Sequence, residues 1–399
     1  MVCYQSVTHN IIGMQKCTLP AHSPLNTAKY LIIDEISMVS KTKLQAMQRA
    51  LSTKSDGNIM GNISFIFFGD FLQFTPVGGT SLINPNTKQN ELLANSVVAS
   101  INAMVELTEQ KRQNDIPYLQ MLRNLRSFKP TENDVSFLKK HCSMPAEKDQ
   151  TDDWLLNAEY IVSENKKRIL WNTRITKAYA KYHERNLYKI SAMDSISCEN
   201  TLIVDRLLEN SCPGYFQKNI YMVIGMPMVV FKNKYKKLGV VNGSIGHLTA
   251  FHHDEYGNLE AIELNFPNLN FKIPGLEKNS LIFCREKIPH TITQYCTKFD
   301  YIREQFPVSE GFCLTDYKKQ GATVQTHSVV SLTSGSKNDM SVYVKLSRSK
   351  SSEKTFIDGE INLKILQMKK PEGYDHFRAT LDTLQENFFR LDRANFFLS

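Results

Sequence analysis

The chain lacks several features that would assign it to a common class of protein. Its eight cysteines include no CxxC pair, so we expect neither a zinc site nor a disulfide framework, and the cysteine usage fits a reducing compartment. No run approaches ~18 consecutive apolar residues, so no transmembrane helix is expected. The first residues show no basic region followed by an apolar one, so no signal peptide is expected.

What is present is compatible with a globular protein that binds polyanions. The 399 residues suffice for two or three domains, and a hydrophobic content of 42% is ample for packed cores. The formal net charge of +8 permits binding to a polyanion but does not by itself identify one.

Residues 30–38 are the most informative stretch. An apolar run over residues 30–33 leads directly into Asp34 and Glu35. Such a run is typical of a strand buried on both faces of a parallel sheet, and charges fit best at its carboxyl edge, where open α/β sheets bind ligands. There Asp34 would hold magnesium through its water shell, and Glu35 would take a proton from an attacking water. The alternative is a strand that ends in a solvated acidic turn.

A second apolar run, residues 65–68, ends in the same way. Gly69 gives the chain room to turn, and Asp70 and Gln73 follow it. A parallel strand would bring both side chains to the edge that carries Asp34. An amide such as Gln73 can hydrogen-bond both a phosphate and the water that attacks it.

The two stretches together, IIDEISM followed by GDFLQFTPV, resemble the Walker B and third motifs of superfamily 1 helicases. Their sequences resemble those of the petite-integration-frequency (PIF) type DNA helicases of superfamily 1B. The resemblance implies an α/β fold of two RecA-like P-loop NTPase-type domains with parallel sheets, ATP as substrate and Mg²⁺ as cofactor.

Further blocks follow in the family's order. Residues 7–14 resemble a TxHxxxG-like segment that faces DNA, although Thr8 or Asn10 could equally cap a helix. Arg112 stands where the family has an arginine that reaches across the inter-domain cleft to the nucleotide. The alternative is an ordinary surface arginine.

The second half of the chain continues the resemblance. Residues 225–246 resemble a GxPVMxxxN…GLxNGxxG element, in which an Asn-Gly hairpin presents nearby lysines to a backbone or to solvent. Residues 314–323 resemble TxHKSQGxT, with Tyr317 in place of the histidine and Lys319 in place of the serine. Residues 342–349 resemble YVALSR, and we expect a strand there that ends in Ser-Arg.

The resemblance assigns roles to particular residues. Catalytic roles fall to Asp34, Glu35, Gln73, Arg112 and Arg348. Contacts with ATP fall to Asp34, Asp70, Gln73, Gln320, Gly321 and Arg348, and Mg²⁺ binding falls to Asp34. Contacts with DNA fall to Thr8, His9, Asn10, Asn242, Thr315 and Lys318.

The expected organisation has four parts. Residues 1–106 form a first, truncated RecA-like domain, and residues 107–231 and 306–362 form the second. Residues from about 245 to 305 alternate short apolar runs with turn residues, a pattern that suits a small β-barrel. The resemblance places an SH3-like β insertion of the family at residues 232–305. Residues 363–399 form a helical tail. Helices are also expected over residues 40–51, 117–126 and 131–141.

One motif of the family is missing. None of the 18 glycines is followed by lysine, so the sequence contains no GxxxxGK[ST] loop to grip phosphates. In the family that loop would fall before Met1. The chain is therefore expected to be an incomplete helicase core, either a catalytically inactive DNA-binding fragment or the product of a gene model that starts too late.

The resemblance implies a 5′-to-3′ DNA helicase that moves on single-stranded DNA and opens forked DNA by hydrolysing ATP. The family acts in DNA repair, recombination and telomere maintenance. It further implies a monomer with no membrane partner, located in the nucleus if the source is eukaryotic.

Overall fold

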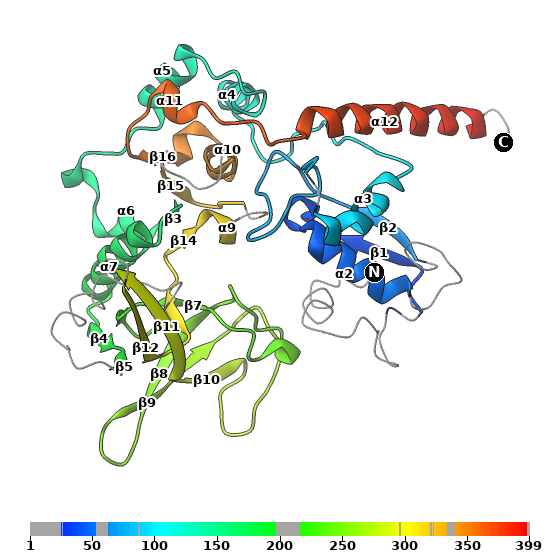
Figure 1. Ribbon diagram of the computed structural model, residues 1–399. Coiled ribbons are helices and arrows are strands. Elements are labelled where there is room, and N and C mark those ends of the chain that lie inside the picture. The colour runs from blue at the N-terminus through cyan, green and yellow to red at the C-terminus, as the bar shows by residue number, and fades with distance from the viewer. Residues whose placement is uncertain are drawn as a thin grey trace. The chain divides into compact units, whose positions relative to one another are not determined.

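The computed structural model describes residues 25, 27–52, 63–86, 88–196, 216–294, 297–319, 321, 323–332 and 340–396 (Figure 1). They form two compact units. The first contains the described residues up to Val135, those of Gly335–Ser347 and those of Asn362–Ser399. The second contains those of Ser136–Ser334 and Arg348–Ile361. None of the helices in these ranges combines the length and the apolar character that a membrane crossing demands.

The first unit is built on the two predicted strands. Strand β1 (Tyr30–Ile33) pairs in parallel with β2 (Ser64–Phe67), so that Ile33 lies opposite Phe67. Both strands therefore end at the same edge of the sheet, as the sequence predicts. The pairing continues past the strands, since the Phe68 N–H donates to the Ile33 carbonyl at 2.8 Å and the Ile36 N–H donates to the Phe68 carbonyl at 2.9 Å.

One face of this sheet carries the core of the unit. Leu31 and Ile33 pack with helix α2 (Lys41–Ser52), through Leu44 and Met47, and with helix α3 (Leu92–Ala99), through Val97. Helix α2 forms where predicted because its apolar residues recur at helical spacing, and the Ser40 hydroxyl caps it by accepting the Lys43 N–H at 3.2 Å.

The prediction that these strands are buried on both faces is wrong for the described residues. Tyr30 is 66% exposed and Ile66 is 41% exposed, and both alternate with the core-facing residues. Successive side chains of a strand point to opposite faces, and the core of α2 and α3 covers only one of them. The apolar run alone could not show which of its residues would be covered.

Helix α4 (Ile116–Arg126) confirms another sequence prediction. Asp115 caps it by accepting the Tyr118 N–H at 3.0 Å, and Pro117 occupies its first turn, where its missing N–H does no harm. Helix α5 (Glu132–His141) also lies where predicted, and its residues from Ser136 on belong to the second unit. The remaining helical segments of the first unit are η2 (Ile36–Met38), η3 (Gln89–Glu91), α10 (Ser341–Leu346), α11 (Leu363–Leu366) and α12 (Tyr374–Phe396).

The expected strand before Arg348 is instead helix α10. The Val344 N–H donates to the Met340 carbonyl at 3.0 Å, and the Ser347 N–H donates to the Tyr343 carbonyl at 2.8 Å. The β-branched valines favour a strand, but propensity is a weak guide where tertiary contacts compete. Here Val344 and Leu346 are buried, and the buried Tyr118 hydroxyl of α4 donates to the Leu346 carbonyl at 2.8 Å.

The second unit contains a four-stranded parallel sheet in the order β14-β3-β15-β16. Helix α7 (Asn165–Tyr182) packs Trp171 and Ile175 on it. Inside the unit, the Asn172 amide accepts the Cys313 N–H at 2.7 Å and donates to the Glu310 carbonyl at 3.2 Å, which joins the helix to two strands. The strands are β3 (Ala158–Val162), β14 (Cys313–Thr315), β15 (His327–Ser331) and β16 (Thr355–Asp358).

Antiparallel sheets make up the rest of this unit. A five-stranded sheet has the order β10-β9-β8-β7-β13, a three-stranded sheet has the order β11-β12-β5, and β4 pairs with β6. The predicted insertion, residues 232–305, is thus antiparallel, but its sheets also use β5, β7 and β13 from outside that range. Its SH3-like character and the four-part division of the chain stay predictions.

The strands of these sheets are β4 (Tyr188–Ser191), β5 (Met193–Ile196), β6 (Asn219–Met222), β7 (Pro227–Val230), β8 (Ile245–His253), β9 (Leu259–Asn265), β10 (Ser280–Cys284), β11 (Glu286–Gln294), β12 (Thr297–Gln305) and β13 (Val308–Glu310). The helical segments of the second unit, besides α7, are η4 (Glu147–Asp149), α6 (Asp152–Leu156), η5 (Lys236–Leu238), α9 (Asp316–Lys319) and η6 (Ser352–Lys354).

The fold yields a stability prediction at Gly69. Its φ is +153°, and a Cβ there would lie 2.8 Å from the backbone nitrogen of Ile36. We expect Gly69→Ala to lower the free energy of unfolding by about 2 kcal/mol or more, because both the backbone strain and the clash must be relieved. Gly78→Ala is the matched control, since its φ is +70° but the space around it is open, and we expect a loss of about 1 kcal/mol. Urea unfolding of both variants measures the difference, and equal losses would contradict it.

Candidate functional site

Asp34 and Glu35 leave β1 in an unusual conformation. Glu35 has φ 51° and ψ 47°, in the left-handed region, and its N–H donates to Asp34 Oδ1 at 2.8 Å. A non-glycine residue rarely adopts this conformation unless its surroundings enforce it, and such strain concentrates at functional sites. Here the enforcement comes from the Ile36 N–H bond to Phe68 and from Gly69, which lies against the peptide bond between Glu35 and Ile36.

Residues 70–73, which we call the 70–73 loop, follow Gly69 at the same edge. The loop holds itself through Asp70, whose Oδ1 accepts the Leu72 N–H at 3.0 Å and whose backbone carbonyl accepts the Gln73 N–H at 2.9 Å. Gln73 Nε2 donates weakly to Asp70 Oδ2 at 3.4 Å. Gln73 Oε1 is covered but accepts no hydrogen bond from the described residues. A covered acceptor of this kind is a position where a bound water or ligand donor would be stabilised.

Asp70 also forms an ion pair that sequence reasoning missed. Arg126, in the last turn of α4, donates to both carboxylate oxygens of Asp70, with Nη2 3.0 Å from Oδ1. Burial alone would lower the pKa of Arg126, but the bond to Asp70 outweighs it and raises that pKa. The guanidinium lies 5.7 Å from the ring centre of Tyr343. Asp70 thus anchors the loop to α4, and its predicted contact with ATP stays a prediction.

Asp34 is the described residue that best fits a magnesium ion at this edge. It is exposed, and its Oδ1 accepts the neighbouring Glu35 N–H. Within the described part of the chain Oδ2 accepts no hydrogen bond. A single carboxylate oxygen that faces solvent suits Mg²⁺, which keeps several of its own waters when it binds with a nucleotide.

Arg112 lies in the same compact unit as Asp34 and Glu35. Its Nη1 donates to the Ser347 carbonyl at 3.0 Å, and the neighbouring Gln113 Nε2 donates to the same oxygen at 2.9 Å. Burial lowers the pKa of Arg112, while Tyr343 and Glu35 act in the opposite direction. The side chain is therefore close enough to interact electrostatically with Glu35.

Arg348 begins the part of the second unit that follows α10. It is 2% exposed, and its carbonyl accepts the Val324 N–H at 3.0 Å. The next residue, Ser349, bonds through its hydroxyl to Ser328 Oγ of β15 at 2.5 Å. The backbone at Arg348 is therefore fixed to the parallel sheet of its own unit.

Lys318, Asn242 and Phe231 form a second group, in the second unit. Lys318 Nζ donates to Asn242 Oδ1 at 3.2 Å and lies 4.6 Å from the centre of the Phe231 ring. The structure thus brings together two predicted DNA contacts that lie 76 residues apart in the sequence. Burial, assisted by the charge of Arg168, lowers the pKa of Lys318 to about 8.

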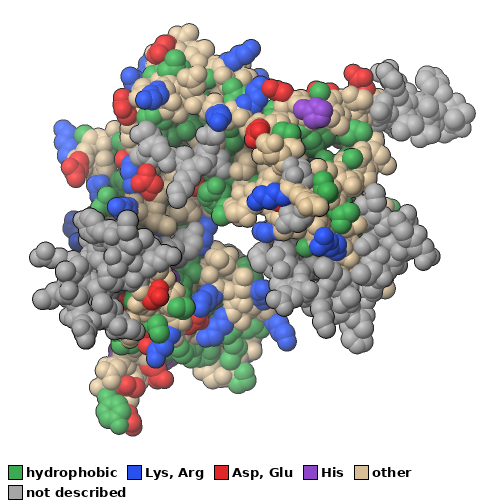
Figure 2. Space-filling model, viewed as in Figure 1, with side chains coloured by type: hydrophobic (Ala, Val, Ile, Leu, Met, Phe, Trp, Pro, Cys, Tyr) green, Lys and Arg blue, Asp and Glu red, His purple; other side chains and the backbone are tan. Residues whose placement is uncertain are grey.

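Around this group the charges are mixed. Lys232 and Lys234 of the predicted lysine cluster pair with Glu286, the latter at 4.0 Å, whereas Lys236 and Lys237 are exposed. Figure 2 shows Lys and Arg side chains lying among Asp, Glu and apolar side chains on the face in view. The basic character predicted from the net charge is therefore local and partly neutralised.

Of the other predicted site residues, some are described by the structure and some lie outside the described residues. Thr315 is buried at the end of β14, and Gly321 is described with a φ of +77°. Thr8, His9, Asn10 and Gln320 lie outside the described residues, so their roles stay predictions. Arg126 and Phe231 were missed. Nothing in the sequence links Arg126 to Asp70, but Phe231 stands directly before a lysine run, a pattern that could have identified it.

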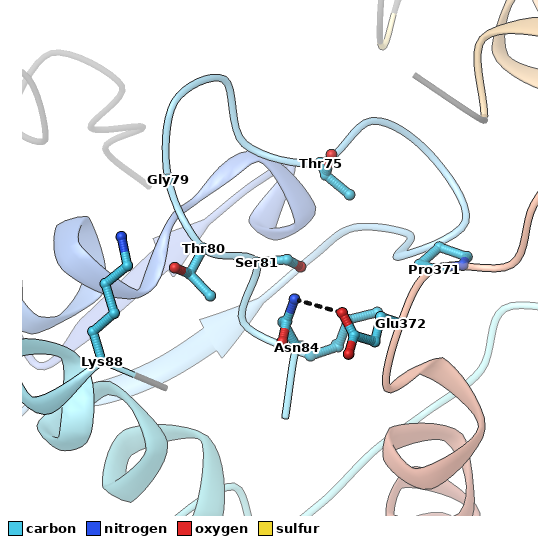
Figure 3. A pocket seen from close by; sticks show the side chains of 9 residues that line it. Thr75, Gly79, Thr80, Ser81, Asn84, Lys88, Pro371 and Glu372 are labelled. Atoms are coloured by element: carbon cyan, nitrogen blue, oxygen red, sulfur yellow. Dashed lines mark hydrogen bonds between the residues drawn. The ribbon is translucent and has the colours of Figure 1, made fainter. Parts of the chain in front are cut away.

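A cavity of about 490 Å³ lies in the first unit, and Thr75, two residues after the 70–73 loop, is part of its lining. Hydroxyl groups of Thr75, Thr80 and Ser81 line it, together with Asn84 and Lys88 (Figure 3). Pro371 and Glu372, from the segment before α12, close another side, and Asn84 Nδ2 donates to Glu372 Oε2 at 3.3 Å.

Known proteins similar to this chain are helicases. Residues 9–131 match the family model of the PIF1-like helicases. The ATP-dependent DNA helicase PIF1 of Xenopus laevis is 28% identical over 235 residues, which is 58% of this chain and 33% of that protein. The corresponding protein of Danio rerio is 25% identical over 337 residues, which is 82% of this chain and 46% of that protein. The chain thus spans less than half the length of these curated relatives.

Solved structures of Pif1 helicases have a fold similar to that of this chain. The Bacteroides Pif1 helicase in complex with ADP-AlF3 and single-stranded DNA has a TM-score of 0.63 at 19% identity, and the match covers 94% of this chain and 83% of that one. The Candida albicans Pif1 helicase has a TM-score of 0.57 at 19% identity over 89% of this chain and 78% of that one. The fold is therefore α/β with RecA-like parallel sheets, as predicted. The family model of the PIF1-like helicases matches residues 9–131, and the fold matches that of solved Pif1 helicases over most of the chain.

Proposed function

We propose that the chain is the core of an ATP-dependent DNA helicase that moves 5′ to 3′ on single-stranded DNA and unwinds duplex DNA at forks. The similarity of the chain to curated ATP-dependent DNA helicases and to the PIF1-like helicase family model supports this. The activity of the whole protein is a proposal, because the chain spans only part of each relative.

The single observation that carries the proposal is the junction of the two acidic strand ends. The bond from the Ile36 N–H to the Phe68 carbonyl, and the close approach of Gly69 to the same peptide, hold residues 34–35 against the start of the 70–73 loop. A carboxylate for the metal, a carboxylate for the proton and an amide for the water are therefore assembled at one sheet edge.

In this proposal Glu35 accepts the proton of a water as the water oxygen bonds to the γ-phosphorus. The bond from that phosphorus to the β–γ bridging oxygen breaks, which gives ADP and phosphate. Gln73 orients the water through its covered Oε1. Asp34 would hold Mg²⁺, which when bound offsets the charge of the phosphates. Arg112, Gln320, Gly321 and Arg348 complete the contacts with ATP.

The proposed DNA contacts centre on Lys318, with Asn242 and Thr315 beside it and Thr8, His9 and Asn10 in the first domain. Phosphate contacts give such proteins most of their affinity. Phe231, over whose ring Lys318 lies, is 6% exposed, so it supports the lysine and offers no stacking surface to a base.

A second function is binding to DNA without hydrolysis of ATP. These 399 residues contain no Gly-Lys pair, so by themselves they supply no GxxxxGK[ST] loop. Without a phosphate-gripping loop the nucleotide loses its main cradle, and loss of such positioning slows catalysis by orders of magnitude. In this case Lys318 and its neighbours would keep their role.

For the biological setting we propose DNA repair, recombination or telomere maintenance by a monomer, in the nucleus if the source is eukaryotic. The curated relatives named for this chain include proteins of eukaryotes. One similar structure, at 19% identity, concerns two coordinating Pif1 helicases at forked DNA, so oligomeric state is best measured on DNA as well as in its absence.

The test of the proposed function is ATP hydrolysis by the chain, with and without single-stranded DNA. We expect Glu35→Gln to lower DNA-stimulated turnover by at least about a hundredfold while ATP binding is retained, because the amide cannot accept the proton. Thr380→Ala, an exposed change on α12, is the control and should keep full turnover. Turnover in Glu35→Gln at the unchanged rate would refute the general base. No turnover in the unaltered chain, with salt-sensitive DNA binding intact, would select the second function.

A pH experiment tests Lys318. Its charged form is the one that binds phosphate, and a pKa of about 8 means that the free protein loses this charge at a lower pH than an ordinary lysine would. We expect affinity for single-stranded DNA to fall up to about tenfold between about pH 7 and about pH 9. Lys318→Arg, which stays charged, should lack this fall. Lys318→Ala should reduce the salt dependence of binding by about one phosphate contact. Identical pH profiles for the native chain and Lys318→Arg would contradict the assignment.

A further inference from the structure

The C-terminal segment of residues 371–382 packs on the first unit next to the 70–73 loop, and we call it the strap. It begins in the loop before α12 and continues into that helix (Figure 1). The Glu372 carboxylate accepts the side-chain amides of Asn84 at 3.3 Å and Asn86 at 2.9 Å. Gly373 has a φ of +82°, and a Cβ there would lie 2.0 Å from the Ile83 carbonyl oxygen. The strap backbone therefore lies directly against the backbone of Ile83, with no room for a side chain.

Helix α12 then contacts the 70–73 loop itself. Phe377 is 9% exposed, and its ring meets the ring of Phe71 edge to face, with centroids 4.9 Å apart at an angle of 76°. Phe71 follows Asp70 directly and precedes Gln73 by two residues. The packing of one aromatic ring therefore constrains the loop that carries the amide expected to orient water.

An ion pair fixes the same turn of α12. Arg378 donates to both carboxylate oxygens of Glu106, at 3.1 and 2.7 Å, and to Asp382 at 2.8 Å. Two parallel bonds of this kind define orientation as well as distance. Tyr374 lies between these contacts. Burial raises the pKa of its hydroxyl, the charges of Arg126 and Arg378 lower that pKa, and the charges of Asp70 and Glu106 raise it. Strap, loop and the Asp70–Arg126 pair thus form one connected cluster.

We propose that the strap is a positioning element for the nucleotide site, which holds the 70–73 loop in the conformation that presents Gln73. Phe377 and Arg378 are its positioning residues, and they act through Phe71 and Glu106 without touching ATP. The catalytic half of this statement rests on the proposed function. The mechanical half, which says that the strap orders the 70–73 loop, does not depend on the proposed function.

The mechanical half is tested by hydrogen exchange in the full chain without any ligand. We expect Phe377→Ala to raise exchange in a peptide that covers residues 70–76 by about tenfold, because the loop loses its aromatic contact and opens more often. The control Thr380→Ala lies on the same helix, is exposed, and has its hydroxyl bonded only to its own turn, at the His376 carbonyl. It should leave that peptide unchanged.

Arg378→Ala serves as the second variant in case Phe377→Ala unfolds α12, and we expect a smaller increase of the same sign. Native exchange of residues 70–76 in either folded variant, or the same increase in Thr380→Ala, would overturn the proposal. This measurement needs no turnover, so it stands even if the chain does not hydrolyse ATP.

If the chain does hydrolyse ATP, a kinetic measurement separates positioning from simple stability. Phe377→Ala should lower kcat about tenfold and change KM for ATP by less than about twofold, because a water-orienting amide acts in the transition state. An unchanged kcat in a chain with accelerated loop exchange would overturn the catalytic half and leave the proposed function untouched.

Discussion

The candidate site depends on a parallel pairing that continues beyond its strands. The ladder of β1 and β2 would end at Ile33 and Phe67, but the Phe68 and Ile36 amides extend it, and Gly69 lies against the peptide after Glu35. This extension forces Glu35 into the left-handed region and keeps two acidic motifs in contact. Strain of about 1–3 kcal/mol at such a residue persists only where the surroundings enforce it. The close packing at Gly69 supplies that enforcement.

Around this junction the first unit holds the 70–73 loop from two sides. Arg126 binds the carboxylate of Asp70, and Phe377 packs on Phe71. The Arg126 contact engages Asp70, one of the residues predicted to meet ATP, whereas the exposed Asp34 carboxylate and the covered Gln73 Oε1 take no part in either contact. This division between anchoring and reacting groups is what a preorganised site requires.

Sequence reasoning was most successful where the physical cause is local. Apolar runs that end in acids predicted β1, β2 and their shared edge, and helical spacing predicted α2, α4 and α5. It failed where a distant partner decides the outcome. The stretch around Val344 forms helix α10, whose Leu346 carbonyl accepts the Tyr118 hydroxyl of α4. Tyr30 and Ile66 are exposed because the described residues cover only the opposite face of their sheet. The Asp70–Arg126 and Phe71–Phe377 contacts join residues 56 and about 300 positions apart, with no local signal.

The measurement that tests the central claim most directly is a hydrogen-exchange footprint of a Mg²⁺–nucleotide complex on this chain in the presence of single-stranded DNA. If residues 34–37 and 68–74 form one nucleotide site, peptides covering both stretches gain protection together, and they lose it together when Mg²⁺ is removed or Asp34 is changed to Asn. Protection that appears in only one of the two stretches, or that survives both changes, would contradict the claim that the paired strand ends bind the nucleotide.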